Sequence, residues 1–297
     1  MCRATLLMSL VLLTGGACAR ARIGAGVLWH PVPARWTPSA LSTSLYEASP
    51  TFTGDGRELF FMQADRDFTR YRLRETRCVE GRWTPPREPS FASQEGVHDA
   101  DPSISPDGTR LYFVSTRHRY QEVGNEDFDI FEVARRPDGT WEPPQRLPEP
   151  VNSPASELLP REDRHGNLYF GSSRPGGRGG SDIYRAERRG HSWTVTRVDS
   201  VNSAANEYEA DISADGMQLA VVSDREVRSR IYLYRKAGGA WRPAGRVRAR
   251  DDVFQVGPLF SPDGRRLLFA QIAGADSGEI FLVDIAEGAN PAWPYEC

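Results

Sequence analysis

The sequence predicts an all-β protein, a five-bladed β-propeller built from four-stranded antiparallel blades. A tight-turn dipeptide recurs five times at intervals of 52, 58, 50 and 48 residues, and a repeat of this length is typical of one propeller blade. After residue 30 no apolar pattern with a helical period occurs, whereas every repeat contains strand-like runs. Small sheets arranged around an axis suit such repeats. The five dipeptides are Asp55-Gly56, Asp107-Gly108, His165-Gly166, Asp215-Gly216 and Asp263-Gly264.

Each repeat shows the same order of strands. A short strand such as Ser103-Ile104-Ser105 precedes the turn, and its single apolar residue between polar ones predicts strand alternation. An apolar run such as 111–114 follows the turn and predicts a buried second strand. A third strand is expected at Asp129, Asp182, Arg230 and Glu279. A fourth is expected from Trp83, Trp141, Trp193 and Trp241, usually with a Pro that suits an edge strand.

One further tryptophan predicts how the ring closes. Trp36-Thr37-Pro38 matches the fourth-strand pattern of Trp83-Thr84-Pro85, yet it precedes the first complete repeat. An N-terminal strand that completes the last blade explains this position. The alternative is that Trp293 supplies the fourth strand of the last blade, so that the Trp36 segment is an accessory strand outside the ring. Six blades are the alternative to five.

The third repeat resembles a known family. Its stretch 169–184 reads Tyr-Phe-Gly-Ser-Ser-Arg-Pro-Gly-Gly-Arg-Gly-Gly-Ser-Asp-Ile-Tyr, which is similar to the WD-type propeller repeats of the TolB-like family of bacterial envelope proteins. The phrase is partial in the second and fourth repeats and eroded in the others. The resemblance covers residues 35 to about 285 and implies a binding propeller with no catalytic residues.

The N-terminus predicts export. Arg3, an apolar stretch at 4–13 and small residues around Cys18 have the three-part form of a secretory signal, and the apolar stretch is too short to span a bilayer. Cleavage near Ala17-Cys18-Ala19 gives a free protein, while acylation of Cys18 gives a lipoprotein, and both remain open. We therefore expect a signal peptide at 1–19, a linker at 20–34, a propeller at 35–290 and a tail at 291–297, in a periplasmic or secreted location.

The cysteine count predicts a disulfide, and the charge and motifs exclude several classes of binding partner. Cys78 and Cys297 remain after export as an even pair in an oxidising space, and a disulfide between them would fasten the tail across the seam of the ring. The net charge of −3 gives no basic footprint for nucleic acid. No zinc-type histidine spacing or phosphate loop occurs, so we expect no metal and no cofactor, and contact with a membrane only through the lipid anchor.

Charged residues recur in register and are the candidate partner-binding rim. Acids stand at the start of the first strands, Arg residues at the end of the second strands, and acids again at the start of the third strands. Because antiparallel neighbours bring these ends to one rim, the columns should meet there. They either form repeated structural ion pairs or bind a partner. The columns are Glu47, Asp99, Glu157 and Glu207; Arg117, Arg174 and Arg225; and Asp129, Asp182 and Glu279.

Glu162 breaks the pattern of the third repeat. It occupies the position held by Phe52, Ile104, Ile212 and Phe260 in the other repeats. A buried lone carboxylate is costly unless it is paired. Either the strand slips so that Leu158 or Leu159 takes the core position, or Glu162 is a functional group at the channel.

Two functions follow from these observations. The first is a non-enzymatic extracytoplasmic propeller that holds an envelope protein or a peptide on its loop-rich rim. The alternative is a five-bladed propeller that binds or hydrolyses a glycan. Hydrolysis needs two carboxyl groups about 5 to 10 Å apart. The acids recur in nearly every repeat, as structure demands, and only Glu162 and Asp163 are locally distinct.

Overall fold

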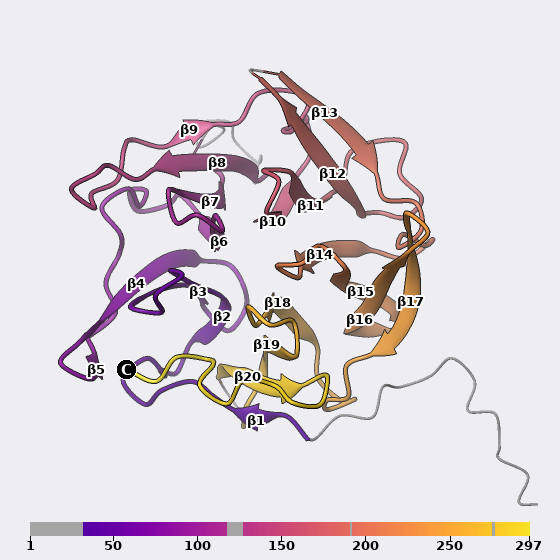
Figure 1. Ribbon diagram of the computed structural model, residues 1–297. Helices are drawn as coiled ribbons and strands as arrows, with labels where there is room; N and C mark the ends of the chain where they lie inside the picture. Colours follow the sequence, from indigo (N-terminus) through magenta and orange to yellow (C-terminus); the bar gives the residue numbers. More distant parts are fainter. Residues whose placement is uncertain (1–31, 118–126, 191, 275–276) are drawn as a thin grey trace, which may run out of the picture.

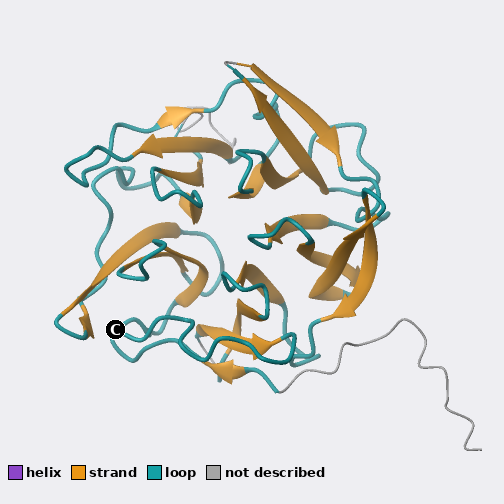
Figure 2. Ribbon diagram, viewed as in Figure 1, coloured by secondary structure: helices purple, strands orange, loops and turns teal. Residues whose placement is uncertain are grey.

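The structure is a computed structural model that describes residues 32–117, 127–190, 192–274 and 277–297. All regular elements in these ranges are β-strands, joined by turns and loops (Figure 2). The predictions for residues 1–31, including the signal peptide, acylation of Cys18 and most of the linker, lie outside the described residues. The described ranges contain no helix of the length and apolarity needed to cross a membrane.

Three antiparallel sheets have four strands each, in chain order. The first contains β6 (Asp99–Ile104), β7 (Arg110–Ser115), β8 (Asp129–Ala134) and β9 (Gln145–Arg146). The second contains β10 (Glu157–Glu162), β11 (Leu168–Ser172), β12 (Asp182–Arg189) and β13 (Ser192–Arg197). The third contains β14 (Glu207–Ile212), β15 (Gln218–Glu226), β16 (Arg228–Ala237) and β17 (Ala240–Arg246).

The remaining eight strands form one sheet with two halves. One half contains β2 (Tyr46–Phe52), β3 (Glu58–Ala64), β4 (Tyr71–Val79) and β5 (Arg82–Trp83). The other contains β18 (Gln255–Phe260), β19 (Arg266–Ile272) and β20 (Gly278–Asp284), with β1 (Ala34–Arg35) paired to β20. A single parallel pair, Tyr46 with Gly278, joins the halves. Each half therefore repeats the order of the four-stranded sheets, and the whole is an all-β, propeller-like fold (Figure 1).

The first strands β2, β6, β10, β14 and β18 line the centre, which we call the channel (Figure 1). Each contacts the next, and β18 contacts β2. Every one of them has a bulge against its neighbour, and four bulges precede a proline. A proline lacks an N–H and suits a bulged innermost strand, which has no partner on its channel side. The bulges bring backbone groups close to the channel axis.

The core lies between neighbouring sheets. The second strands supply its largest members, which are fully buried: Phe60 and Phe61, Tyr112 and Phe113, Phe170, and Phe269. These belong to the apolar runs that follow each turn dipeptide. Burying such rings contributes about 1.5 to 3 kcal/mol each, so the repeated runs stabilise the contacts between neighbouring sheets.

The two chain ends meet on the same sheet. Ala34 pairs with Leu282, and the backbone N–H groups of Trp36 and Thr37 donate to the Ile280 carbonyl at 2.8 and 3.2 Å. Trp293 packs on Leu268 and Ile280, but the described residues around it form no strand. The outer neighbour of β20 is therefore the N-terminal segment.

A disulfide joins the C-terminal tail to the first half of this sheet. Cys78 near the end of β4 is bonded to Cys297, 219 residues away. Two residues before Cys297, the Tyr295 ring lies directly over Gly56, where an added Cβ would stand only 2.1 Å from the ring. The tail therefore lies across the tight turns on one face of the channel.

Candidate binding site in the central channel

The acids that start the first strands hold the strand ends together. Glu157 is fully buried and accepts hydrogen bonds from the Ser153 N–H at 3.1 Å, the Ser172 hydroxyl at 2.9 Å and Arg174 Nη2 at 3.1 Å. Glu207 has the same set, with Arg225 Nη2 at 2.8 Å. The acid and arginine columns meet as the sequence indicates.

The remaining members of the columns are also paired within the protein. Asp99 accepts from Arg117 at 3.0 Å, and Asp129 forms a bidentate pair with Arg146 at 2.9 and 2.7 Å. Glu279 pairs with Arg35 at 2.6 Å, Asp182 accepts the Arg178 N–H at 2.5 Å, and Glu47 accepts from the Thr43 hydroxyl at 2.5 Å. All of these carboxylates are buried. Their charge therefore stabilises loops and strand ends, and contact of these side chains with a partner stays a prediction.

Glu162 stands in register with its siblings. It pairs with Leu168 as Phe52 pairs with Leu59, so the strand does not slip at this position, and that alternative is wrong. Leu159 is fully buried, but as the bulge residue. Glu162 is buried and forms an ion pair with Arg110 of β7 at 2.9 Å. Burial raises the pKa of its carboxyl group, and Arg110 opposes that rise.

The neighbouring Asp163 has a turn function. In the other four turns a Ser or Thr hydroxyl bonds the turn Asp two residues on, as Ser105 does to Asp107 at 2.6 Å. In the third repeat the acid, Asp163, stands at the position that the Ser or Thr holds in the other turns, two residues before His165. Asp163 accepts the His165 N–H at 2.8 Å and the Asn167 N–H at 3.0 Å, and so replaces the aspartate that His165 displaced.

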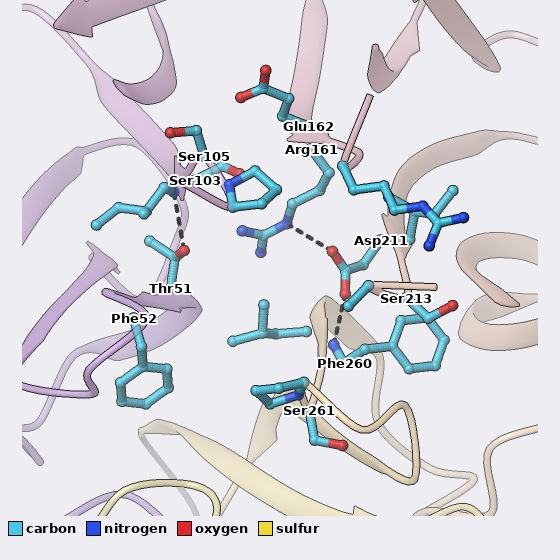
Figure 3. A pocket seen from close by; sticks show the side chains of 18 of the residues that line it. Thr51, Phe52, Ser103, Ser105, Arg161, Glu162, Asp211, Ser213, Phe260 and Ser261 are labelled. Atoms are coloured by element: carbon cyan, nitrogen blue, oxygen red, sulfur yellow. Dashed lines mark hydrogen bonds and ion pairs between the residues drawn. The ribbon is translucent and has the colours of Figure 1, made fainter. Parts of the chain in front are cut away.

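The channel has a pocket at each end. At the end with the tight turns lies a cavity of about 340 Å³, which we call the turn-side pocket (Figure 3). Its walls are the ends of the five first strands together with the C-terminal tail. Apolar Phe52 and Phe260 line it beside the paired Glu162, and Tyr295 of the tail also borders it.

Arg161 crosses the channel at the floor of the turn-side pocket (Figure 3). Its side chain is 3% exposed, and its guanidinium donates to the carbonyls of Pro102 at 3.2 Å, Pro258 at 3.3 Å and Pro50 at 3.5 Å. The guanidinium also forms an ion pair with Asp211 at 3.5 Å. Arg161 on β10 therefore joins four other first strands. No repeated pattern in the sequence singles out Arg161 as the residue that joins these strands.

Asp211 is the counterion of Arg161 and has a second partner. Its Oδ2 accepts the Phe260 N–H at 2.6 Å. Burial raises the pKa of Asp211 to about 6, although Arg161 lowers it. This carboxylate therefore links β14 to β18 while it balances the central cation.

The opposite end of the channel holds a cavity of about 320 Å³, which we call the aromatic cup. Its aromatic lining residues are Phe68, Tyr71, Phe128, Tyr208 and Phe254, and its carboxyl groups belong to Asp101 and Glu209. This is the end at which the first strands begin, on the loop side of the fold. A mainly apolar cavity with a few convergent polar groups has the form of a ligand site.

The rings of the cup form a continuous surface. Phe68 lies 5.6 Å from Phe254 and 6.4 Å from Tyr71, and Tyr71 lies 5.7 Å from Phe128, measured between ring centroids. Tyr46 stacks on Phe254 at 5.4 Å and supports the wall from behind. Rings from four separate segments of the chain therefore meet at one place.

Phe68 is held in the cup by a strained loop. Its φ of 54° lies in the left-handed region, which is unfavourable for an aromatic residue. Asp65 keeps the loop in this form, because its carboxylate accepts the Thr69 N–H at 2.7 Å and the Thr69 hydroxyl at 2.6 Å. The Thr69 hydroxyl lowers the pKa of Asp65 to about 2. Such strain is common where a side chain is placed for a function.

The two acids of the cup differ in their partners. Asp101 accepts the Ser49 hydroxyl at 2.8 Å and the Leu159 N–H at 3.2 Å. Among the described residues, Glu209 accepts only the Gly257 N–H, at Oε2 and 2.6 Å. Burial and then the charge of Asp101 raise the pKa of Glu209 to about 8, and burial also raises that of Asp101. In the described ranges no cluster of His, Cys, Asp or Glu could hold a metal ion.

Comparison with known proteins shows the fold but no family. No protein-family model and no curated protein matches the chain. A candidate TolB from Agrobacterium tumefaciens is similar in structure, with 17% identity, a TM-score of 0.53, and coverage of 82% of this chain and 78% of that one. Zg3597, a family 117 glycoside hydrolase from Zobellia galactanivorans, matches with 10% identity, a TM-score of 0.60, and coverage of 90% and 94%. The chain therefore has a TolB-like, propeller-like fold.

The sequence held a signal for the cup that repeat alignment did not use. Asp101 and Glu209 each stand two residues after a column acid, in the phrases Asp-Ala-Asp at 99–101 and Glu-Tyr-Glu at 207–209. Alternation would place both acids of a pair on the same face of a strand, but a bulge separates the two Glu residues of β14 and also interrupts β6. The second acid in each phrase therefore lines the channel.

Proposed function

We propose that this chain is a non-enzymatic extracytoplasmic propeller that binds a protein or peptide partner, with the aromatic cup as its binding site. The cup itself is the observation that carries this proposal. It is a preformed cavity of about 320 Å³ whose rings come from loops and from the beginnings of strands on one face of a rigid ring of strands. Loops on a rigid scaffold are where binding residues concentrate.

We further infer that the architecture is a five-bladed ring closed by the N-terminal strand. The support is the pairing of β1 with β20 and the two hydrogen bonds from Trp36 and Thr37 to Ile280. Deletion of residues 34–45 should expose the edge of β20 and lower the cooperativity of unfolding. A truncated protein that unfolds like the parent would remove this inference.

The location outside the cytoplasm rests on the predicted signal peptide and on the Cys78 to Cys297 disulfide, since such bonds persist in oxidising compartments. Whether the mature protein is free or anchored through Cys18 is testable by mass. Fractionation of cells that express the full chain, with mass spectrometry of the mature N-terminus, distinguishes an acylated Cys18 from an unmodified N-terminus.

The binding proposal is tested with peptides and paired variants. A library of random peptides is panned against the purified protein, and affinities of the enriched sequences are measured by calorimetry. The variants Phe254→Ala and Tyr71→Ala should weaken these peptides at least tenfold. Met217→Ala, an exposed change in a tight turn on the other face, should not. Enriched peptides that bind both cup variants as tightly as the parent would show that the cup is not the site.

A second candidate is a glycan-binding or glycan-hydrolysing propeller. Two observations favour it: the cup holds two carboxyl groups with raised pKa values, and the glycoside hydrolase Zg3597 is similar over 94% of its length. Such a pair is what acid and base roles require. Release of reducing ends from a panel of oligosaccharides, lost in Glu209→Gln and Asp101→Asn but kept in Glu162→Gln, would replace the binding proposal with this one.

A further inference from the structure

We propose that the aromatic cup is selective for an organic cation, and that it takes the ammonium or guanidinium group of a lysine or arginine side chain. The inference rests on the proposed binding function and names the part of the partner that enters the cup. It follows from the charges, the open oxygen atom and the rings of the cup, taken in that order.

The channel has more acids than bases. Three carboxyl groups, of Asp101, Glu209 and Asp211, are buried around one guanidinium, that of Arg161. Arg161 forms its ion pair with Asp211, and in the described residues no basic side chain lies within 4.0 Å of the other two carboxyl groups. Buried carboxylates are normally paired or bound to a cation. The cup thus lacks a positive charge that a ligand can supply.

Glu209 offers an oxygen atom for that ligand. Glu209 is 8% exposed and lines the cup, and its Oε2 accepts a hydrogen bond from the Gly257 N–H at 2.6 Å. No donor in the described part of the chain reaches the second oxygen, Oε1. Gly257 has a φ of 63°, and an added Cβ would stand only 2.6 Å from the Ser49 backbone N, so this bulge needs a glycine. The backbone therefore holds this carboxyl group in place with one oxygen left for a guest.

The walls suit a cation with an apolar stem. Ring faces attract an ammonium or guanidinium group within about 6 Å of the ring centre, by about 0.5 to 2 kcal/mol. The apolar side chains of Met62, Leu158 and Val256 also line the cup and can contact the methylene groups of lysine or arginine. A bare metal ion would find few oxygen ligands among these rings. The combination of rings, apolar walls and one open carboxyl oxygen therefore favours an organic cation.

The titration of Glu209 makes the pH dependence of binding a second test of the inference. With a pKa of about 8 the group is largely protonated at neutral pH, and a bound cation would displace that proton. Affinity should therefore rise as the pH rises from about 6 to about 9. The charged and titratable groups that act on Glu209 are Asp101 on β6, Arg161 on β10, and Tyr46 and Tyr208, whose own pKa values burial and Glu209 raise.

The experiment compares matched tripeptides by calorimetry. Acetyl-Gly-Lys-Gly-amide should bind at least tenfold more tightly than the norleucine peptide of the same shape, and more tightly at pH 9 than at pH 6. Glu209→Gln should remove both the preference and its pH dependence. Glu162→Gln, a matched change at the turn-side pocket, should leave both unchanged. Phe254→Leu keeps an apolar wall but removes a ring, and should weaken the lysine peptide more than the norleucine peptide.

Each contrary result has a separate meaning. Equal binding of the lysine and norleucine peptides, or an undiminished lysine preference in Glu209→Gln, would overturn the cation inference while the cup remained a binding site. If Glu209→Gln does not fold, the Phe254→Leu comparison decides the same question. Peptides from panning that ignore Phe254→Ala and Tyr71→Ala would instead overturn the proposed function.

Discussion

The two ends of the channel are similar in size but opposite in how their charges are matched. The turn-side pocket measures about 340 Å³ and the aromatic cup about 320 Å³, and both contain buried carboxyl groups. In the turn-side pocket Glu162 pairs with Arg110 and Asp211 pairs with Arg161. In the cup neither Asp101 nor Glu209 has a basic partner within ion-pair distance among the described residues.

This difference distinguishes carboxylates that hold the fold together from carboxyl groups that are candidates for binding a ligand. A carboxylate with its own arginine contributes to holding two strands together and has no charge left to offer. One that stays buried without a counterion costs free energy, and a fold keeps such a group where a ligand compensates for it. The same reasoning applies to most acids of the rim columns, which pair with an arginine, while Glu47 and Asp182 accept hydrogen bonds from neighbouring hydroxyl, amide or backbone N–H groups. Burial alone therefore does not distinguish the two ends, whereas counterions do.

The largest expected effect comes from removing the arginine between the two ends. Arg161→Met should lower the free energy of unfolding by about 3 to 5 kcal/mol, because it leaves Asp211 buried without its counterion. Chemical denaturation measures this loss. The double variant with Asp211→Asn should recover part of it. A single variant as stable as the parent would show that the central ion pair does not hold the first strands together.

A smaller loss of unfolding free energy is expected when the disulfide is removed. This bond lies at the end of the channel with the tight turns. Replacing Cys78 and Cys297 with Ser should cost about 2 to 4 kcal/mol, because the bond closes a loop of more than 200 residues in the unfolded chain. Unfolding curves with and without reductant measure it, and the double Ser variant, insensitive to reductant, is the control. Peptide affinity at the cup should not change. Identical curves for the parent under both conditions would contradict the prediction.

The direct comparison of the two ends uses one substitution in each. Glu162→Gln should destabilise the protein by about 1 to 3 kcal/mol, since Arg110 loses its charged partner. Glu209→Gln should be close to neutral, because it removes a carboxyl group that has no basic partner. Thermal melts of both variants at neutral pH measure the contrast. Equal losses would mean that the two carboxyl groups are matched alike.

The smallest effect is the pH dependence. Burial raises the pKa of Asp211 to about 6 and that of Glu209 to about 8, so the folded protein keeps protons that the unfolded chain has lost. Stability from these groups is full below a pH of about 4 and falls as the pH rises through about 8. The melting temperature of Glu209→Gln should fall less between pH 6 and pH 9 than that of the parent. Parallel curves would show that Glu209 titrates normally.

Several features could be predicted from residue patterns because local rules govern them. The turn dipeptides place left-handed glycines such as Gly56 and Gly108 between paired strands, and the apolar runs form buried second strands. The acid and arginine columns meet because antiparallel strands return to the same edge. Residue patterns do not reveal the partner of Glu162, because Arg110, with which it forms an ion pair, belongs to the neighbouring repeat.

Residue patterns along the chain are enough to predict the all-β class, the repeated strand order and the residues at each strand end, because turns and alternation depend on neighbours along the chain. Which buried charges have a counterion depends on contacts between residues far apart in the sequence. Arg161 reaches Pro258 across 97 residues, and Gly257 reaches Glu209 across 48. Such contacts depend on how the strands are arranged around the channel and on bulges that turn single residues toward it. Pairing of buried charges is a matter of distance in space, so the aromatic cup emerged only from the fold.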